Sequence, residues 1–300
     1  MRGVPRHRTS LRHELLTLLL GRLRRTPTVT DVPAARETLV ARNREAHSRP
    51  PRRVAQEWVV EVRDIGFPVY VLTPRHGMYS RTLVHVHGGS FTAEAHPAQW
   101  RFATRLARRT GARLVFPAYP LAPEFTWRDS YEPLVDLVAK LCAETPLVLA
   151  GDSAGGGLAL ALAEGVRDRG GEQPTHLVLV SPWVDLTTSA PGTAEAGARD
   201  PWLNVDNVPV YAEFWAGSPD DLARPEVSPG LADLTGLPPT LMLCGTRDVL
   251  FPACEQLAER ATLRDWDCTF VVGEGLMHVY PLLPVPEART AFRQIVAFLR

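Results

Sequence analysis

The chain has 300 residues, of which 45% are apolar, and its 33 basic side chains balance its 33 acidic ones. A chain of this length can bury a large core, and no break in composition marks a linker, so one α/β domain with appended segments is the simplest organisation. Because the charge is balanced, it gives no indication of a nucleic-acid partner. The four cysteines have no metal-ligand spacing, so no metal, cofactor or disulfide is expected: Cys142, Cys244, Cys254 and Cys268.

The N-terminal segment places a run of leucines between arginines at 11–25. It lacks the cleavage site of a secretory signal and is too short to span a bilayer, which predicts an amphipathic helix. Such a helix could cover an apolar pocket of its own protein or lie on a membrane surface, and the first is favoured because it is far commoner. We expect 1–55 to be an N-terminal cap segment of a cytoplasmic protein without stable membrane insertion.

Apolar runs rich in Val and Leu predict eight strands, at 58–63, 68–74, 82–88, 113–120, 146–151, 176–183, 240–245 and 268–273. Helix-like stretches alternate with the later strands, at 97–110, 128–144, 153–169, 252–264 and 286–299. This alternation predicts a mostly parallel sheet with helices on both faces, and the closely spaced first strands predict an antiparallel edge. The main domain would therefore cover 56–300, with a second cap candidate inserted at about 185–235, where Pro, Gly, Ala and Trp are frequent.

The strand at 146–151 leads through Gly-Asp-Ser-Ala-Gly directly into a helix, which makes Ser153 the candidate nucleophile. In the pattern G-x-S-x-G the outer positions are small because the backbone reverses tightly and leaves the serine Oγ exposed at the tip. A phosphate-binding loop is the alternative for a glycine-rich turn, but the Gly-Lys-Ser/Thr ending is missing. The strand before the turn and the helix after it favour the nucleophile.

A serine nucleophile needs a base within hydrogen-bond reach and an acid that orients this base. Asp248 and His278 follow two late strands in the expected order, so both should emerge at the same sheet edge as Ser153. The competing acids are more typical of solvated positions: Asp265, Asp267 and Glu274. Other histidines precede the core strands, lie in surface-like surroundings or open a strand: His7, His13, His47, His76 and His176.

Backbone N–H donors for a tetrahedral oxyanion are expected after the strand at 82–88, where the chain reads His-Gly-Gly-Ser. Gly88 and Gly89 would act together with the amide of Ala154, the residue after the nucleophile. His87 is assigned a structural role. The alternative is a plain strand-end turn, which Gly-Gly often forms.

The chain resembles the hormone-sensitive-lipase family of esterases in HGG, GDSAGG, YPLAPE at 119–124, SPWVDLT at 181–187 and the stretch 227–250. The resemblance implies an α/β-hydrolase fold with a helical cap and metal-free hydrolysis of carboxylic esters. It carries over Ser153, Asp248 and His278 as the catalytic triad, with Gly88, Gly89 and Ala154 as the oxyanion hole.

Two departures from the family pattern bear on the pocket. Ser90 replaces a third glycine after HGG, and Pro120 replaces an arginine that could fix the loop carrying Glu124. Aromatic residues near the pocket predict an apolar substrate site, in which we place Ser90, Phe91, Trp183 and Phe214.

These features predict a serine carboxylesterase for short- to medium-chain esters that works through an acyl-enzyme. Its substrate would be a small ester, and the chain could form a homodimer. The same triad serves amides, formamides and lactones, and the same scaffold serves non-catalytic receptors for small molecules. The sequence leaves the natural substrate, the acyl or alcohol preference and the oligomeric state undetermined.

Overall fold

A computed structural model describes residues 9–23, 27–45 and 48–300 of the chain. Eight strands form one sheet in the order β1-β2-β4-β3-β5-β6-β7-β8. Their bounds are β1 (Trp58–Asp64), β2 (Pro68–Pro74), β3 (Arg81–Val86), β4 (Ala112–Pro117), β5 (Leu147–Asp152), β6 (His176–Val180), β7 (Thr240–Arg247) and β8 (Cys268–Met277). β2 pairs antiparallel with both β1 and β4, and the remaining neighbours in the sheet, from β4 through β3 to β8, pair parallel. This confirms the predicted sheet with its antiparallel edge.

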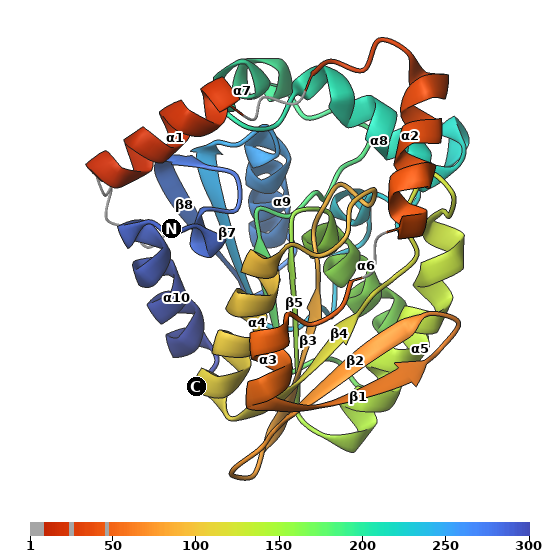
Figure 1. Cartoon of the computed structure of the whole chain (residues 1–300), viewed down its shortest axis with the longest axis vertical. Helices are drawn as coiled ribbons and strands as arrows, with labels where there is room; N and C mark the ends of the chain where they lie inside the picture. Colours follow the sequence, from red (N-terminus) through yellow and green to blue (C-terminus); the bar gives the residue numbers. More distant parts are fainter. Residues whose placement is uncertain (1–8, 24–26, 46–47) are drawn as a thin grey trace.

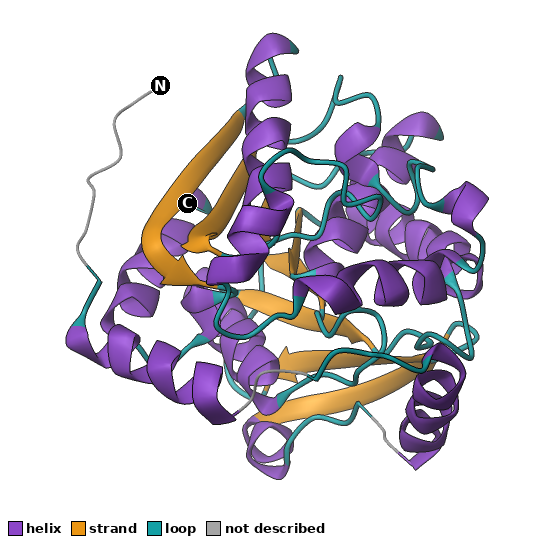
Figure 2. Ribbon diagram, turned by 90° about the horizontal axis from the view of Figure 1, so that it is seen from above, coloured by secondary structure: helices purple, strands orange, loops and turns teal. Residues whose placement is uncertain are grey.

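Helices cover both faces of this sheet, as the alternation of strands and helices predicts (Figure 1). On one face lie α3 (Arg52–Glu57), α4 (Pro97–Thr110) and α10 (Pro286–Phe298). On the other face lie α5 (Trp127–Glu144), α6 (Ala154–Asp168) and α9 (Phe251–Leu263). Figure 2 shows the strong twist of the sheet between these layers.

The two faces have separate hydrophobic cores because successive side chains of a strand point to opposite sides. In β5, Leu147 and Leu149 belong to the core under α5 and α6, whereas Val148 and Ala150 belong to the core under α4 and α10. A strand that is buried on both sides is apolar throughout, which explains the continuous Val and Leu runs of the sequence.

Four further helices form a row along one end of the molecule (Figure 1). They are α1 (Leu11–Leu23), α2 (Val32–Glu45), α7 (Thr193–Arg199) and α8 (Val208–Ala216), and we call them the rim helices. Short 3-10 turns accompany the loops: η1 (Val205–Asn207), η2 (Pro219–Asp221), η3 (Pro229–Leu231) and η4 (Tyr280–Leu282). The side chain of Asn207 accepts from Val29 N–H at 2.7 Å and donates to Pro27 O at 2.8 Å, so the N-terminal segment and the insertion after β6 meet here.

The orientation of α1 corrects two expectations. The helix at 11–25 should bury its leucines, yet Leu11, Leu15, Leu18 and Leu19 are exposed. His13, expected in surface-like surroundings, is fully buried instead, and its Nε2 accepts from Met277 N–H at 3.2 Å. The helix therefore docks through a mixed side, on which Leu16 and Leu20 are half-buried beside His13. In the described part of the chain, no helix has the length and hydropathy needed to cross a bilayer.

Candidate active site

Ser153 stands at the sharp turn between β5 and α6, with a φ of 53° in the left-handed region. The two flanking glycines are required by space. A Cβ on Gly151 would lie 2.2 Å from the carbonyl oxygen of Gly155, and one on Gly155 would lie 2.3 Å from the carbonyl oxygens of Val86 and His87. The turn therefore holds the serine in a backbone conformation that a non-glycine residue adopts rarely.

The three side chains proposed for catalysis lie in one hydrogen-bonded line. His278 Nε2 lies 3.0 Å from Ser153 Oγ, and His278 Nδ1 lies 2.8 Å from Asp248 Oδ2. All three side chains are buried. With Nδ1–H donating to the carboxylate, Nε2 is free to accept the serine proton, which is the tautomer that nucleophile activation requires.

The acid is fixed by the turn that follows β7. Asp248 Oδ1 accepts from Leu250 N–H at 3.0 Å, while Oδ2 faces the imidazole. The acids that compete in the sequence lie exposed elsewhere: Asp265, Asp267 and Glu274. Parallel strands that end at one edge bring Ser153, Asp248 and His278 together across 125 positions of the chain.

Carboxylates around His278 set its proton affinity. Burial acts to lower the pKa of His278, but Asp248, and then Asp200 and Asp152, outweigh it and hold the pKa above the ordinary 6.5. Burial and the nearby Asp248 raise the pKa of Asp200 to about 6. The charge of Asp200 therefore matters for the base, although the sequence analysis did not single this residue out.

Asp200 also ties the insertion after β6 to the acid loop. Its Oδ2 accepts from Val249 N–H at 2.9 Å, next to Asp248. Its Oδ1 accepts from Trp202 N–H and Leu203 N–H, both at 2.8 Å. The Trp202 ring stands edge-on to the imidazole of His278, with 5.9 Å between the ring centroids.

The backbone after β3 turns through Gly89, Ser90 and Phe91, all with positive φ. Among the described residues, no acceptor is bonded to the N–H groups of Gly88, Gly89 or Ala154. Ala154 opens α6, where the first N–H groups have no partner within the helix. These amides are free to bind an external oxyanion.

Buried polar side chains hold this turn in place from below. Gln99 Nε2 donates to Gly88 O at 3.2 Å and to Asp152 Oδ2 at 2.8 Å, and His85 Nε2 lies 3.1 Å from Asp152 Oδ1. His87 stacks on Tyr119 with 4.4 Å between the ring centroids. Burial lowers the pKa of His87 to about 4, so its imidazole is neutral at pH 7.

The Ser153 hydroxyl faces a cavity of only about 30 Å³. Ser90, Trp183 and Leu250 of the main domain line it, together with four residues of α8 and of the loop before η1: Leu203, Asn204, Val208 and Tyr211. Ser90 and Trp183 are thus at the place expected for substrate contacts. Phe91 stacks on Trp215 with 4.1 Å between the ring centroids. Neither Phe91 nor Phe214 lines this cavity.

The remaining predicted positions lie away from the reacting atoms. His76 is exposed, and His176 packs its ring against Phe298. His7 and His47 lie outside the described residues. Glu124, which has no arginine at position 120 to fix its loop, pairs with Arg44 of α2 at 3.1 Å instead.

A family model described as the alpha/beta hydrolase fold matches residues 83–282. The chain belongs to the α/β-hydrolase family. Among the relatives of this α/β hydrolase, a protein named acetyl-hydrolase from Streptomyces hygroscopicus is 33% identical over 229 residues, or 73% of this chain and 75% of the relative. One named esterase from Acinetobacter venetianus is 28% identical over 225 residues, covering 73% and 74% of the two chains.

Solved structures agree with the family. An esterase of the bacterial hormone-sensitive lipase family superposes with a TM-score of 0.80 at 25% identity, covering 98% of this hydrolase and 99% of the other chain. A hyperthermophilic esterase from the archaeon Pyrobaculum calidifontis gives 0.81 at 27% identity, with 98% of each chain covered. The resemblance and the fold class predicted from the motifs are confirmed.

Proposed function

We propose that this α/β hydrolase is a serine carboxylesterase for esters of short acyl chains, with Ser153 as nucleophile, His278 as base and Asp248 as the orienting acid. The observation that carries the proposal is the unbroken line of hydrogen bonds from Asp248 through His278 to Ser153. The names esterase and acetyl-hydrolase among its relatives favour esters over amides and lactones.

In the first step, Ser153 Oγ attacks the ester carbonyl carbon while its proton passes to His278 Nε2. The carbonyl oxygen becomes negatively charged and is stabilised by the free N–H groups of Gly88, Gly89 and Ala154. The carbon–oxygen bond to the alcohol then breaks, and His278 returns the proton to the leaving alcohol. Water repeats the sequence on the acyl-serine, releases the acid and restores the Ser153 hydroxyl.

A relative named acetyl-hydrolase supports short acyl chains. The space of about 30 Å³ beside Ser153 is too small for any ester, so the residues over it must move before substrate binds. We assign 1–55 and 185–235 to a cap in which α8 and the loop before η1 lie over Ser153 and move outward to admit substrate. The name of this relative favours the short-chain end of the predicted range.

The test is hydrolysis of p-nitrophenyl esters from acetate to decanoate, with acetanilide in parallel. We expect acetate to butyrate to give the highest kcat/KM, and Ser153→Ala to lower kcat by at least about 10³-fold at unchanged thermal stability. Ser130→Ala is the matched control, because Ser130 is a fully buried serine of α5 that takes no part in the catalytic line. A Ser153→Ala protein with wild-type turnover refutes the mechanism. A preference for the anilide refutes the assignment of esters as the substrate class.

A further inference from the structure

The exposed side of α1 carries an apolar stripe. Leu11, Leu15, Leu18 and Leu19 are 90%, 57%, 51% and 44% exposed, and their spacing places them on one face of the helix. The opposite face holds the buried His13, and Glu14 at its side pairs with Arg247 at 2.9 Å. Leu16 and Leu20 are half-buried on the same side as His13, so the four exposed leucines are not needed to hold the helix on the body.

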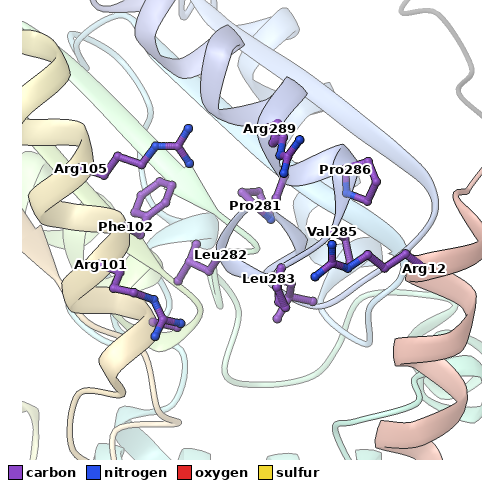
Figure 3. Close-up of a pocket in the computed structure, with 13 residues that line it drawn as sticks. Arg12, Arg101, Phe102, Arg105, Pro281, Leu282, Leu283, Val285, Pro286 and Arg289 are labelled. Carbon is purple, nitrogen blue, oxygen red and sulfur yellow. The ribbon is translucent and has the colours of Figure 1, made fainter.

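Beside this stripe lies a cavity of about 390 Å³ between α1, α4, α10 and the η4 loop (Figure 3). Its floor is apolar, with Phe102 and the segment 281–286, and four arginines surround it: Arg12 from α1, Arg101 and Arg105 from α4, and Arg289 from α10. We call these the pocket arginines. They come from three separate helices, so the gathering of positive charge is a property of the fold.

The pocket arginines lack acidic partners. In the described ranges, no carboxylate forms an ion pair with any of the four, although arginines elsewhere do, such as Arg128 with Asp221 and Arg113 with Glu144. The nearby Glu287 is occupied as an acceptor for Ser10 N–H at 2.5 Å. Arg105 stacks on the Phe292 ring at 3.9 Å, which leaves its N–H donors free.

The two features form one continuous surface. Arg12 belongs to the pocket, and it is followed on the same side of α1 by Leu15 and Leu19, at i+3 and i+7. Arg22 lies exposed at the far end of the leucine face. Figure 1 shows α1 along the edge of the molecule, above α10, with no other element outside it.

We propose that this surface docks the hydrolase on an anionic lipid membrane, with the leucines of α1 in the interface and the pocket arginines on lipid phosphates. Exposed leucines add apolar area that a membrane interface can bury, and exposed arginines are attracted to anionic lipid phosphates. A helix of 13 residues is too short to span the bilayer, so the attachment is peripheral.

Other occupants fit the surface less well. A small phosphorylated ligand would satisfy the pocket arginines but leave the leucine stripe in water. A two-fold dimer would bury the leucines, but it would bring two arginine-rich surfaces together. An anionic lipid membrane offers phosphates to the pocket arginines and an apolar interior to the leucines.

The test is co-sedimentation of the full chain with vesicles of phosphatidylcholine alone and of phosphatidylcholine mixed with phosphatidylglycerol. We expect binding only to the mixed vesicles, weakened by added salt. The variants Leu15→Gln/Leu19→Gln and Arg101→Ala/Arg289→Ala should each lower the partition coefficient by about tenfold or more. All side chains changed here are exposed and outside the catalytic line, so hydrolysis of a soluble ester should stay at the wild-type rate.

Matched controls carry the same changes away from the surface. Leu231→Gln/Leu263→Gln alters two leucines that are 43% and 81% exposed, and Arg109→Ala/Arg293→Ala alters two exposed arginines of α4 and α10 outside the pocket. The proposal is overturned if the protein does not bind the mixed vesicles, or if the control variants weaken binding as much as the test variants. It is also overturned if light scattering shows a stable dimer that Leu15→Gln/Leu19→Gln dissociates. Binding should be the same for Ser153→Ala, which separates this test from that of the catalytic mechanism.

Discussion

Ser153 and the residues around it illustrate what single positions contribute. Gly151 and Gly155 are required by backbone contacts, and this is why the short pattern G-x-S-x-G is informative in a sequence. The pattern, the chain order of serine, acid and base, and the ends of late strands were sufficient to select the three residues that form the hydrogen-bonded line. Asp200 escaped selection because its importance comes from tertiary proximity to Asp248, which no local pattern reveals.

The carboxylates near His278 determine the pH dependence of activity. His278 must be neutral to accept the serine proton, so activity falls as the pH drops through its pKa, and the midpoint should lie above the ordinary 6.5. Asp200→Asn removes one charge that favours the protonated imidazole, so the acid limb of kcat/KM should move down by about half to one pH unit. Asp206→Asn, at an exposed position of η1, should leave the midpoint in place. An upward shift or no shift in Asp200→Asn would refute the electrostatic role.

Elements of the central layer were predictable, and elements of the rim were not. Each central strand is apolar on both sides, and each covering helix has one apolar side, so both leave periodic signals. The rim helices depend on partners far away in the sequence, as α1 does through the contacts of His13 with Met277 and of Glu14 with Arg247. This is why the exposure of four leucines of α1 was not foreseen and why Tyr211 was not recognised beside the nucleophile.

The turn of α8 that lines the cavity should control the enzyme's preference for the length of the acyl chain. Tyr211 lines the cavity with a half-buried ring. Tyr211→Ala opens space next to Ser153, so kcat/KM for p-nitrophenyl hexanoate relative to acetate should rise by about tenfold. Glu213→Ala, at an exposed position of the same helix, is the control. An unchanged ratio in Tyr211→Ala would show that α8 does not limit the acyl group.

At the scale of the whole molecule, His13 couples the N-terminal helix to the loop that carries the base. Its Nε2 accepts from the N–H of Met277, the neighbour of His278. Burial lowers the pKa of His13 below the ordinary 6.5, despite the opposing charges of Glu287 and Glu14. Because the neutral form is the one that fits, the contribution of His13 to stability is complete above pH 6.5 and is lost as the pH falls towards its folded pKa.

Substitutions of His13 should therefore separate the hydrogen bond from the titration. His13→Ala leaves the Met277 N–H without an acceptor and should lower the free energy of unfolding by about 1–3 kcal/mol at pH 7.5, measured in urea. His13→Gln keeps an acceptor that does not titrate, so it should lose less stability than the alanine variant and flatten the decline between pH 7 and pH 5. Equal stability of wild type and His13→Ala at pH 7.5 would contradict this coupling.

The central claim is that three side chains from distant parts of the chain make one activated nucleophile, and covalent labelling measures this most directly. The protein is treated with a fluorophosphonate, and the adduct is located by mass spectrometry. We predict one adduct per chain, on Ser153, with labelling slowed by about 10³-fold or more in His278→Ala and absent in Ser153→Ala. Labelling of another serine, or an undiminished rate in His278→Ala, would contradict the account.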